Sequence, residues 1–260
     1  MFRFSLTMIA VCWIAQPGLA HYNMLLPETN SPKKGDKVGF VYQFGHPFEH
    51  ELFDAPQPTR LEVRLPDGKI IDLTAKLEKF KKPGGVDGKD VIAFRFDFTP
   101  EQRGDHWFIL TAAPIWMEES KEFYQDVVQT VLHVQTQNGW TEVPGNPMRL
   151  VPLTRPYGIL PGMVFRAKLV QPLPGYKPVE IERYNPQRPK EIPPDELVTF
   201  TTLPDINGVI GCTLTEPGWW CITARAEFAG KRTLTHDGND YPVRPRVTLW
   251  LHVTTKADAK

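Results

Sequence analysis

Histidines are concentrated near the start of the chain in a pattern that could bind a metal ion. Residues 45–51 have the sequence GHPFEHE, in which His46 and His50 flank Glu49. If Pro47 begins a helical turn, side chains at positions i and i+4 lie on the same side of it, which would bring the two imidazoles together. Imidazole binds nickel, cobalt, copper and zinc, whereas magnesium and calcium prefer oxygen ligands. Two surface histidines that bind nothing explain the same spacing.

His21 would be the amino-terminal residue if residues 1–20 were removed as a signal peptide. Arg3 precedes a mostly apolar run, and the small residues Gly18 and Ala20 stand at the −3 and −1 positions that signal peptidase requires. A terminal histidine offers an α-amine and an imidazole that can chelate one metal ion. Because the strand that follows leads directly to residue 46, an extended start of the chain could fold back beside it.

These positions together predict one metal site. We expect the amine and imidazole of His21 to bind the ion with His46 or His50, with Glu49 and Met24 as further candidate ligands. For Met24, a place in the hydrophobic core explains the residue better. Since amine and imidazole must lose protons before they bind a metal, the affinity should fall below about pH 6.5.

Charge and hydropathy restrict the partners. The chain has 30 basic and 30 acidic residues, and loss of Arg3 with the leader would leave a net charge of −1, which argues against nucleic acid and anionic membranes as partners. Nothing after the leader supplies the roughly 20 apolar residues of a spanning helix. We therefore expect an exported, periplasmic protein that is soluble and has no stable membrane insertion. The motifs of serine hydrolases, phosphate-binding loops and zinc proteases are absent, so no enzymatic activity is expected.

Two cysteines follow the leader, Cys212 and Cys221. An even number of cysteines in an oxidising compartment is typical of a disulfide. If residues 215–218 form the loop of a hairpin, the two cysteines face each other on adjacent strands, close enough to be bridged. A shift of the loop by one residue would separate them.

Alternating hydrophobicity predicts an all-β protein. Residues of one face recur with period two in two series of segments, separated by turn signals. The first series covers 38–44, 61–65, 92–98, 106–111 and 127–134, and the second covers 163–169, 197–202, 208–214, 219–227 and 247–253. We expect two β-sandwich domains: an immunoglobulin-like one at 21–147, with the candidate metal site, and a smaller one at 148–260.

An ordered series of short motifs resembles a known family. The chain is similar to periplasmic components associated with cobalt and nickel uptake systems, a family often catalogued only as a domain of unknown function. The resemblance covers nearly the whole chain after the leader, in the segments Ala20-His21, Leu26-Pro27, His46-Pro47-Phe48-Glu49-His50, Ala113-Pro114-Ile115-Trp116, Val151-Pro152-Leu153-Thr154-Arg155-Pro156-Tyr157-Gly158 and Pro217-Gly218-Trp219-Trp220.

The resemblance implies a protein that binds nickel or cobalt in the periplasm and delivers it to a membrane permease or importer. His21, His46 and His50 are the matching candidate ligands. Two features depart from the family: Gln125-Asp126 stands where relatives carry a histidine, and the cysteine pair is not a family feature. Two other functions fit the residues, namely an adhesion or scaffolding module without metal and a copper protein with an amino-terminal histidine brace.

Overall fold

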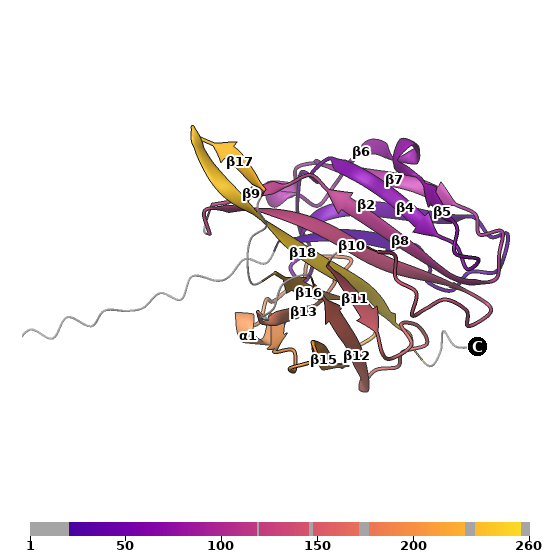
Figure 1. Ribbon diagram of the computed structural model, residues 1–260. Helices are drawn as coiled ribbons and strands as arrows, with labels where there is room; N and C mark the ends of the chain where they lie inside the picture. Colours follow the sequence, from indigo (N-terminus) through magenta and orange to yellow (C-terminus); the bar gives the residue numbers. More distant parts are fainter. Residues whose placement is uncertain (1–20, 119, 146–147, 172–176, 227–231, 256–260) are drawn as a thin grey trace, which may run out of the picture.

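The computed structural model describes residues 21–260 except 119, 146–147, 172–176, 227–231 and 256–260. The expected signal peptide, residues 1–20, lies outside the described residues. The described chain is all-β, as predicted, and its strands form several sheets in a sandwich-like arrangement (Figure 1). The helical elements described are one turn of α-helix, α1 (Asp195–Val198), and two short 3₁₀ helices, Thr74–Lys76 and Val86–Gly88.

The first sheet, here the N-terminal sheet, has five strands. Its order is β1-β2-β7-β6, and β3 pairs with the end of β2. Every pair in this sheet is antiparallel. Its strands are β1 (Tyr22–Pro27), β2 (Val38–His46), β3 (Glu51–Phe53), β6 (Glu78–Lys82) and β7 (Val91–Phe98).

The second sheet, the central sheet, has ten strands and extends through the whole molecule. Its order is β14-β13-β16-β18-β10-β8-β4-β5, with β17 beside β18 and β9 beside β10. Its strands from the first half are β4 (Pro58–Arg64), β5 (Ile70–Asp72), β8 (Gly104–Ala112), β9 (Ile115–Met117) and β10 (Glu122–Val134). Those from the second half are β13 (Val179–Arg183), β14 (Thr199–Thr202), β16 (Gly218–Arg225), β17 (Thr233–His236) and β18 (Asn239–Val253).

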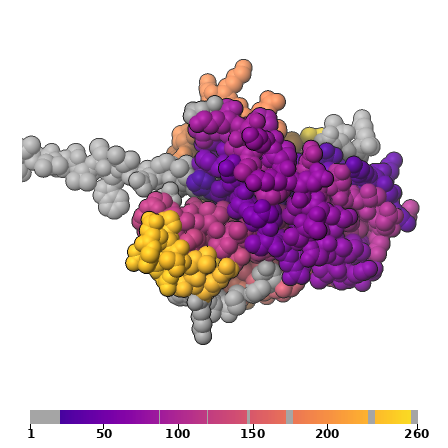
Figure 2. All heavy atoms as spheres, turned by 90° about the horizontal axis from the view of Figure 1, so that it is seen from above, coloured from indigo at the N-terminus to yellow at the C-terminus, as the bar shows by residue number. Residues whose placement is uncertain are grey.

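A parallel pair joins the two halves of the central sheet. The long strands β10 and β18 lie side by side from Phe123↔Val243 to Thr130↔Trp250, and in Figure 1 they run between the purple N-terminal strands and the brown and orange C-terminal strands. The predicted domains 21–147 and 148–260 therefore contribute strands to one sheet. Figure 2 shows the N-terminal strands over one face, with the yellow β17–β18 hairpin beside them.

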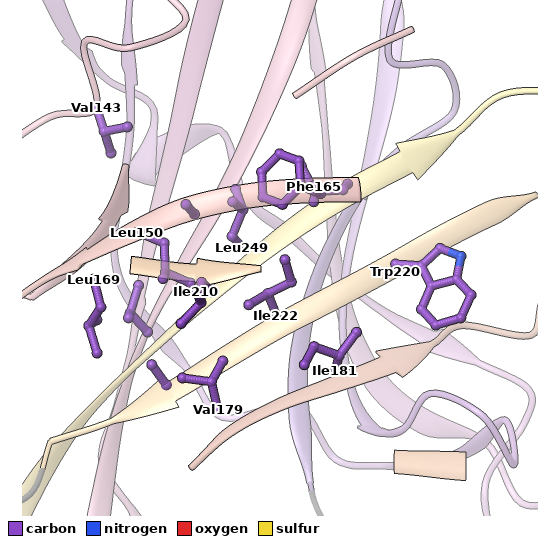
Figure 3. Close-up of a cluster of buried hydrophobic side chains, with 14 of the residues drawn as sticks. Val143, Leu150, Phe165, Leu169, Val179, Ile181, Ile210, Trp220, Ile222 and Leu249 are labelled. Atoms are coloured by element: carbon purple, nitrogen blue, oxygen red, sulfur yellow. The ribbon is translucent and has the colours of Figure 1, made fainter. Parts of the chain in front are cut away.

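The third sheet, the C-terminal sheet, contains β11 (Arg149–Pro152), β12 (Met163–Val170) and β15 (Val209–Leu214). Its apolar side chains pack against those of the central sheet, as Phe165 and Ile210 do against Ile222 and Leu249 in Figure 3. This cluster is one of two hydrophobic cores formed by the described residues. The other core lies between the N-terminal sheet and the opposite face of the central sheet.

Strand periodicity produces this three-layer arrangement. Successive side chains of a strand point to opposite faces, so a central strand with both faces covered must be apolar at consecutive positions. In β10, Val127 and Val131 join the C-terminal core, whereas Val128 and Leu132 join the N-terminal core. The described part of the chain contains no helix long and apolar enough to cross a membrane.

The predicted disulfide between Cys212 and Cys221 is wrong: both cysteines are free. The loop at 215–217 does not close a hairpin but carries the chain from one sheet to another. Cys212 lies opposite Phe165 in the C-terminal sheet, whereas Cys221 lies between Glu182 and Trp250 in the central sheet. Burial raises the pKa of the Cys212 thiol to about 12 and that of Cys221 well above its ordinary value.

Candidate functional site

The pairing of β1 with β2 brings His21 and His46 together. Tyr22 lies opposite Gly45 in this antiparallel pair, and the same register places the residue before Tyr22 opposite the residue after Gly45. The centroids of the two imidazole rings are 4.5 Å apart, with an interplanar angle of 54°. The expected meeting of these residues across the first strands is therefore present in the structure.

Aromatic side chains surround the two imidazoles. The His21 ring stacks on Phe44 at a centroid distance of 5.6 Å and lies 5.1 Å from Phe53. The Phe53 ring is also 5.3 Å from that of His46. The two phenyl rings give the pair an apolar environment, and His21 is half-buried.

The two nitrogens of His46 have different surroundings. The side chain is 6% exposed. Its Nδ1 lies 3.3 Å from Oε2 of Glu51, the residue opposite it in the β2–β3 hairpin. Its Nε2 is buried and has no hydrogen-bond partner among the described residues. A buried imidazole nitrogen without a partner is costly unless something binds it.

His50 does not join this pair. Residues 47–50 form the turn between β2 and β3, not the helical turn that the i, i+4 spacing predicted, and His50 has a positive φ of 49°. Its Nδ1 lies 2.9 Å from the carbonyl oxygen of Asn185, and its ring lies 5.8 Å from that of Tyr184. Burial lowers the pKa of His50, which favours the neutral ring.

The other two predicted ligands differ in their surroundings. Glu49 is half-buried in the turn after His46. Met24 is fully buried in the N-terminal core, and its Sδ accepts a hydrogen bond from Nε2 of Gln43 at 3.4 Å. Met24 therefore lies in the hydrophobic core, as its sequence position favoured.

Residues from the second half of the chain fasten the turn. Asn185 donates from its backbone N–H to the carbonyl of Pro47 (3.0 Å) and from Nδ2 to that of Phe48 (2.6 Å). The N–H of Phe48 donates to Oε1 of Glu182 at 3.1 Å. Sequence reasoning missed both residues, because they are more than 130 positions away and belong to no motif.

Glu182 is an unusual support for this turn. It is 2% exposed, and Thr199 donates to its Oε2 at 2.7 Å. Burial raises its pKa to about 8, because the charged form loses its hydration. The carboxyl group is therefore mainly protonated at neutral pH.

Gln125 and Asp126, which stand where the resemblance expects a further histidine, both contact arginine side chains. Gln125 accepts a hydrogen bond from Arg232 at 2.9 Å. Asp126 is buried in an ion pair with Arg246, with an N–O distance of 2.6 Å. Neither of these contacts involves the imidazole ring of His21 or His46.

The remaining histidines occupy other parts of the molecule. His106 is buried beside Phe98, His133 contacts Asp105, His236 stacks on Trp116, and His252 lies against Trp219. No three His, Cys, Asp or Glu side chains within the described ranges are grouped so that they could hold a metal ion. A metal at the His21–His46 pair would therefore need a donor of another kind, and the α-amine that removal of residues 1–20 would leave on His21 is such a donor.

Comparisons with solved structures give only distant likenesses. A DUF4785 family protein from Legionella pneumophila is 10% identical, with a TM-score of 0.30, over 79% of this chain and 52% of that chain. Salmonella α-2-macroglobulin reacted with methylamine is 13% identical (TM-score 0.27; 92% of this chain, 15% of that one). Dimeric latent PorU from Porphyromonas gingivalis is 10% identical (TM-score 0.25; 90% and 20%).

Comparison with curated proteins gave no match. A family model with the description "Domain of unknown function (DUF4198)" matches residues 18–228. Because this match covers most of the 260 residues, the chain belongs to the DUF4198 family.

Proposed function

We propose that this protein is an exported, periplasmic metal-binding protein that binds nickel or cobalt and delivers it to a membrane importer. The ion would be held by the α-amine and imidazole of His21 and by Nε2 of His46, after removal of residues 1–20. The observation that carries the proposal is the 4.5 Å separation of the two imidazole rings, together with the buried Nε2 of His46 that lacks a partner among the described residues.

The chemistry of the donors supports late first-row metals. Three nitrogen ligands suit nickel, cobalt and copper, whereas calcium and magnesium need oxygen ligands in larger numbers. Glu51 at Nδ1 of His46 favours the proton on that atom and leaves the Nε2 lone pair for the metal, as carboxylates that accept a hydrogen bond from a metal-binding histidine do. Three protein ligands leave coordination positions open, which suits an ion that must later be released.

Calorimetric titration of tag-free protein beginning at His21 tests this function. We expect stoichiometric binding of nickel or cobalt to the wild type and a loss of at least tenfold in affinity for His21→Ala and His46→Ala, because even the loss of a group that orients a ligand costs about 10- to 100-fold. One extra residue ahead of His21 should have the same effect, because it removes the chelating amine. His236→Ala is the matched control, since His236 lies in the β17–β18 hairpin, where its ring stacks on Trp116 of β9.

The titration also separates the alternatives. Absence of stoichiometric uptake of any of these metals would favour an adhesion or scaffolding module. Two imidazoles and one amine are also the donor set of a copper histidine brace, and this set is the specific observation that favours copper as a second candidate. A copper affinity above that expected from the usual order of divalent metals, with negligible nickel binding, would favour that function.

Delivery to an importer needs a separate test. Cells that lack this protein should accumulate less nickel or cobalt at low external concentrations, and the wild-type gene should restore uptake while the His46→Ala variant should not. Equal uptake with and without the protein would contradict the delivery role but leave metal binding intact.

A further inference from the structure

The outer edge of β1 is covered by side chains of the central sheet. Because β1 is the last strand of its sheet, its alternate carbonyl groups point away from β2 and need other donors. Three such carbonyls are paired, each with a different side chain: His21 with Nη2 of Arg246 (2.7 Å), Asn23 with Nε1 of Trp250 (2.9 Å), and Leu25 with Oγ1 of Thr130 (2.8 Å).

The parallel pair β10–β18 places these donors in a row. Thr130 lies opposite Trp250, and four residues earlier Asp126 lies opposite Arg246. Since side chains of a strand repeat with period two, residues four apart point to the same face of the sheet, here the face toward β1. The row therefore holds the strand from Leu25 back to His21, the residue that precedes it.

Arg246 at the end of the row is itself held rigidly. Its Nε and Nη2 donate to the two oxygens of Asp126 at 2.7 and 2.6 Å, and its side chain is 7% exposed. Asn23 donates from Nδ2 to the same carboxylate. A bidentate pair of this kind fixes the plane of the guanidinium group, so Nη2 meets the carbonyl oxygen of His21 in one direction.

This contact acts at the residue that would chelate the metal. The first residues of a chain are usually poorly ordered unless side chains tie them down. The carbonyl carbon of His21 is bonded to the Cα that carries both the amine and the imidazole, so holding this carbonyl also restricts where the two nitrogens can lie. A ligand ordered before binding costs less conformational entropy when the ion arrives.

We propose that Arg246, oriented by Asp126, is a positioning residue of the metal site that holds the His21 chelate in place beside His46. The inference rests on the proposed function. It assigns to a residue 225 positions away in the sequence a role in metal affinity that no motif indicates.

The test compares two ways of weakening the row of donors. In tag-free protein beginning at His21, Arg246→Lys retains the charge but loses the bidentate geometry, and Thr130→Val removes the donor to Leu25 with little change of shape. We expect Arg246→Lys to lower nickel affinity by about tenfold or more, as the loss of a group that orients a metal ligand does. Thr130→Val should bind nickel as the wild type does, even where thermal unfolding shows that it is less stable.

Electron paramagnetic resonance of the copper-loaded protein provides a readout that a general loss of folding stability would not change. The wild type and Thr130→Val should give one spectral species, and Arg246→Lys more than one, because the chelate is no longer held in a single orientation. If Arg246→Lys does not fold, the double variant Asp126→Leu/Arg246→Met replaces the buried pair with apolar groups, an exchange that folded proteins often tolerate.

The outcomes separate this inference from the proposed function. A wild type that binds no nickel, cobalt or copper would overturn both. A wild type that binds, with unchanged affinity and a single copper species in the Arg246 variants, would overturn the positioning role alone. An equal loss of affinity in Thr130→Val would also overturn it, because the effect would then belong to the anchoring of β1 in general.

Discussion

The environment of His46 explains how a single residue could be prepared for a metal ion. Its Nδ1 faces a carboxylate, its Nε2 is buried without a partner among the described residues, and the ring of His21 lies beside it. The sequence predicted that His21 would meet either His46 or His50, from the residue types and the strand between them. It did not predict that Glu51, rather than Glu49, contacts His46, because that depends on the hairpin register.

Glu51→Gln should weaken metal binding without removing a ligand. The amide keeps the size of the carboxyl group but donates as well as accepts, so it holds the Nδ1–H tautomer less firmly and makes Nε2 a weaker base. We expect nickel affinity to fall by about tenfold. Arg188→Ala is the control, since Arg188 lies 3.6 Å from the other oxygen of Glu51 and is mostly exposed; an equal effect of both variants would contradict the tautomer role.

Glu182 makes stability depend on pH in a predictable direction. Burial raises its pKa to about 8 in the folded protein, whereas in the unfolded chain the group titrates near ~4.3. Between these values the folded state holds a proton that the unfolded state has lost, so a rise in pH favours unfolding. Glu182→Gln has no carboxyl group at this position, so it does not lose stability in this way as the pH rises. The Thr199 hydroxyl, which donates to Glu182, can instead accept a hydrogen bond from the new amide.

The free energy of unfolding of Glu182→Gln, relative to the wild type, should therefore increase between about pH 4 and pH 8. One pKa unit corresponds to ~1.4 kcal/mol, so the gain should be on the order of a few kcal/mol. Urea unfolding at a series of pH values measures it. Curves for the two proteins that stay parallel over this range would show that Glu182 is not protonated in the folded protein.

At the scale of elements, alternating hydrophobicity predicted the first strand of the β2–β3 hairpin but not the hairpin itself. The run at 38–44 predicted a strand, and β2 indeed covers Val38–His46. The helical turn expected after it does not form, because Gly45, at φ 150°, lets the chain continue into a hairpin with His46 opposite Glu51. Whether a histidine–proline pair begins a helical turn or closes a hairpin depends on the next strand, three residues long, which is too short for a periodic signal.

Gly45→Ala should disrupt this hairpin. A Cβ at position 45 would lie 2.1 Å from the carbonyl oxygen of Glu51, so the two strands would have to separate. We expect a loss of stability of ~1–3 kcal/mol and weaker nickel binding, because His46 would move with its strand. Gly238→Ala is the matched control: it also has a positive φ, 79°, but nothing lies within 4 Å of the added carbon. Equal losses in both variants would mean that only the backbone conformation matters.

At the scale of the whole molecule, the parallel pairing of β10 with β18 determines how the two halves are joined. It unites the two predicted halves in one sheet and supplies the row of donors that holds β1. Alternating hydrophobicity identified most of the strands, since each face must match a core. It cannot show which strands pair, and the disulfide prediction failed for this reason: Cys212 and Cys221 are near in sequence, but their strands pair in different sheets.

The reactivity of Cys221 should report on the cooperativity of the whole molecule. Its thiol is fully buried in the middle of the central sheet, and burial raises its pKa well above the ordinary value, so the reactive thiolate forms only when the sheet opens. In a Cys212→Ser background, labelling by a thiol reagent should be negligible in the native protein. It should accelerate with urea in step with unfolding followed by tryptophan fluorescence. Cys221 faces the core that also contains Trp250 and residues of β1. Labelling that is fast and independent of urea would show that this core opens without global unfolding. The two halves of the molecule would then behave as independent units.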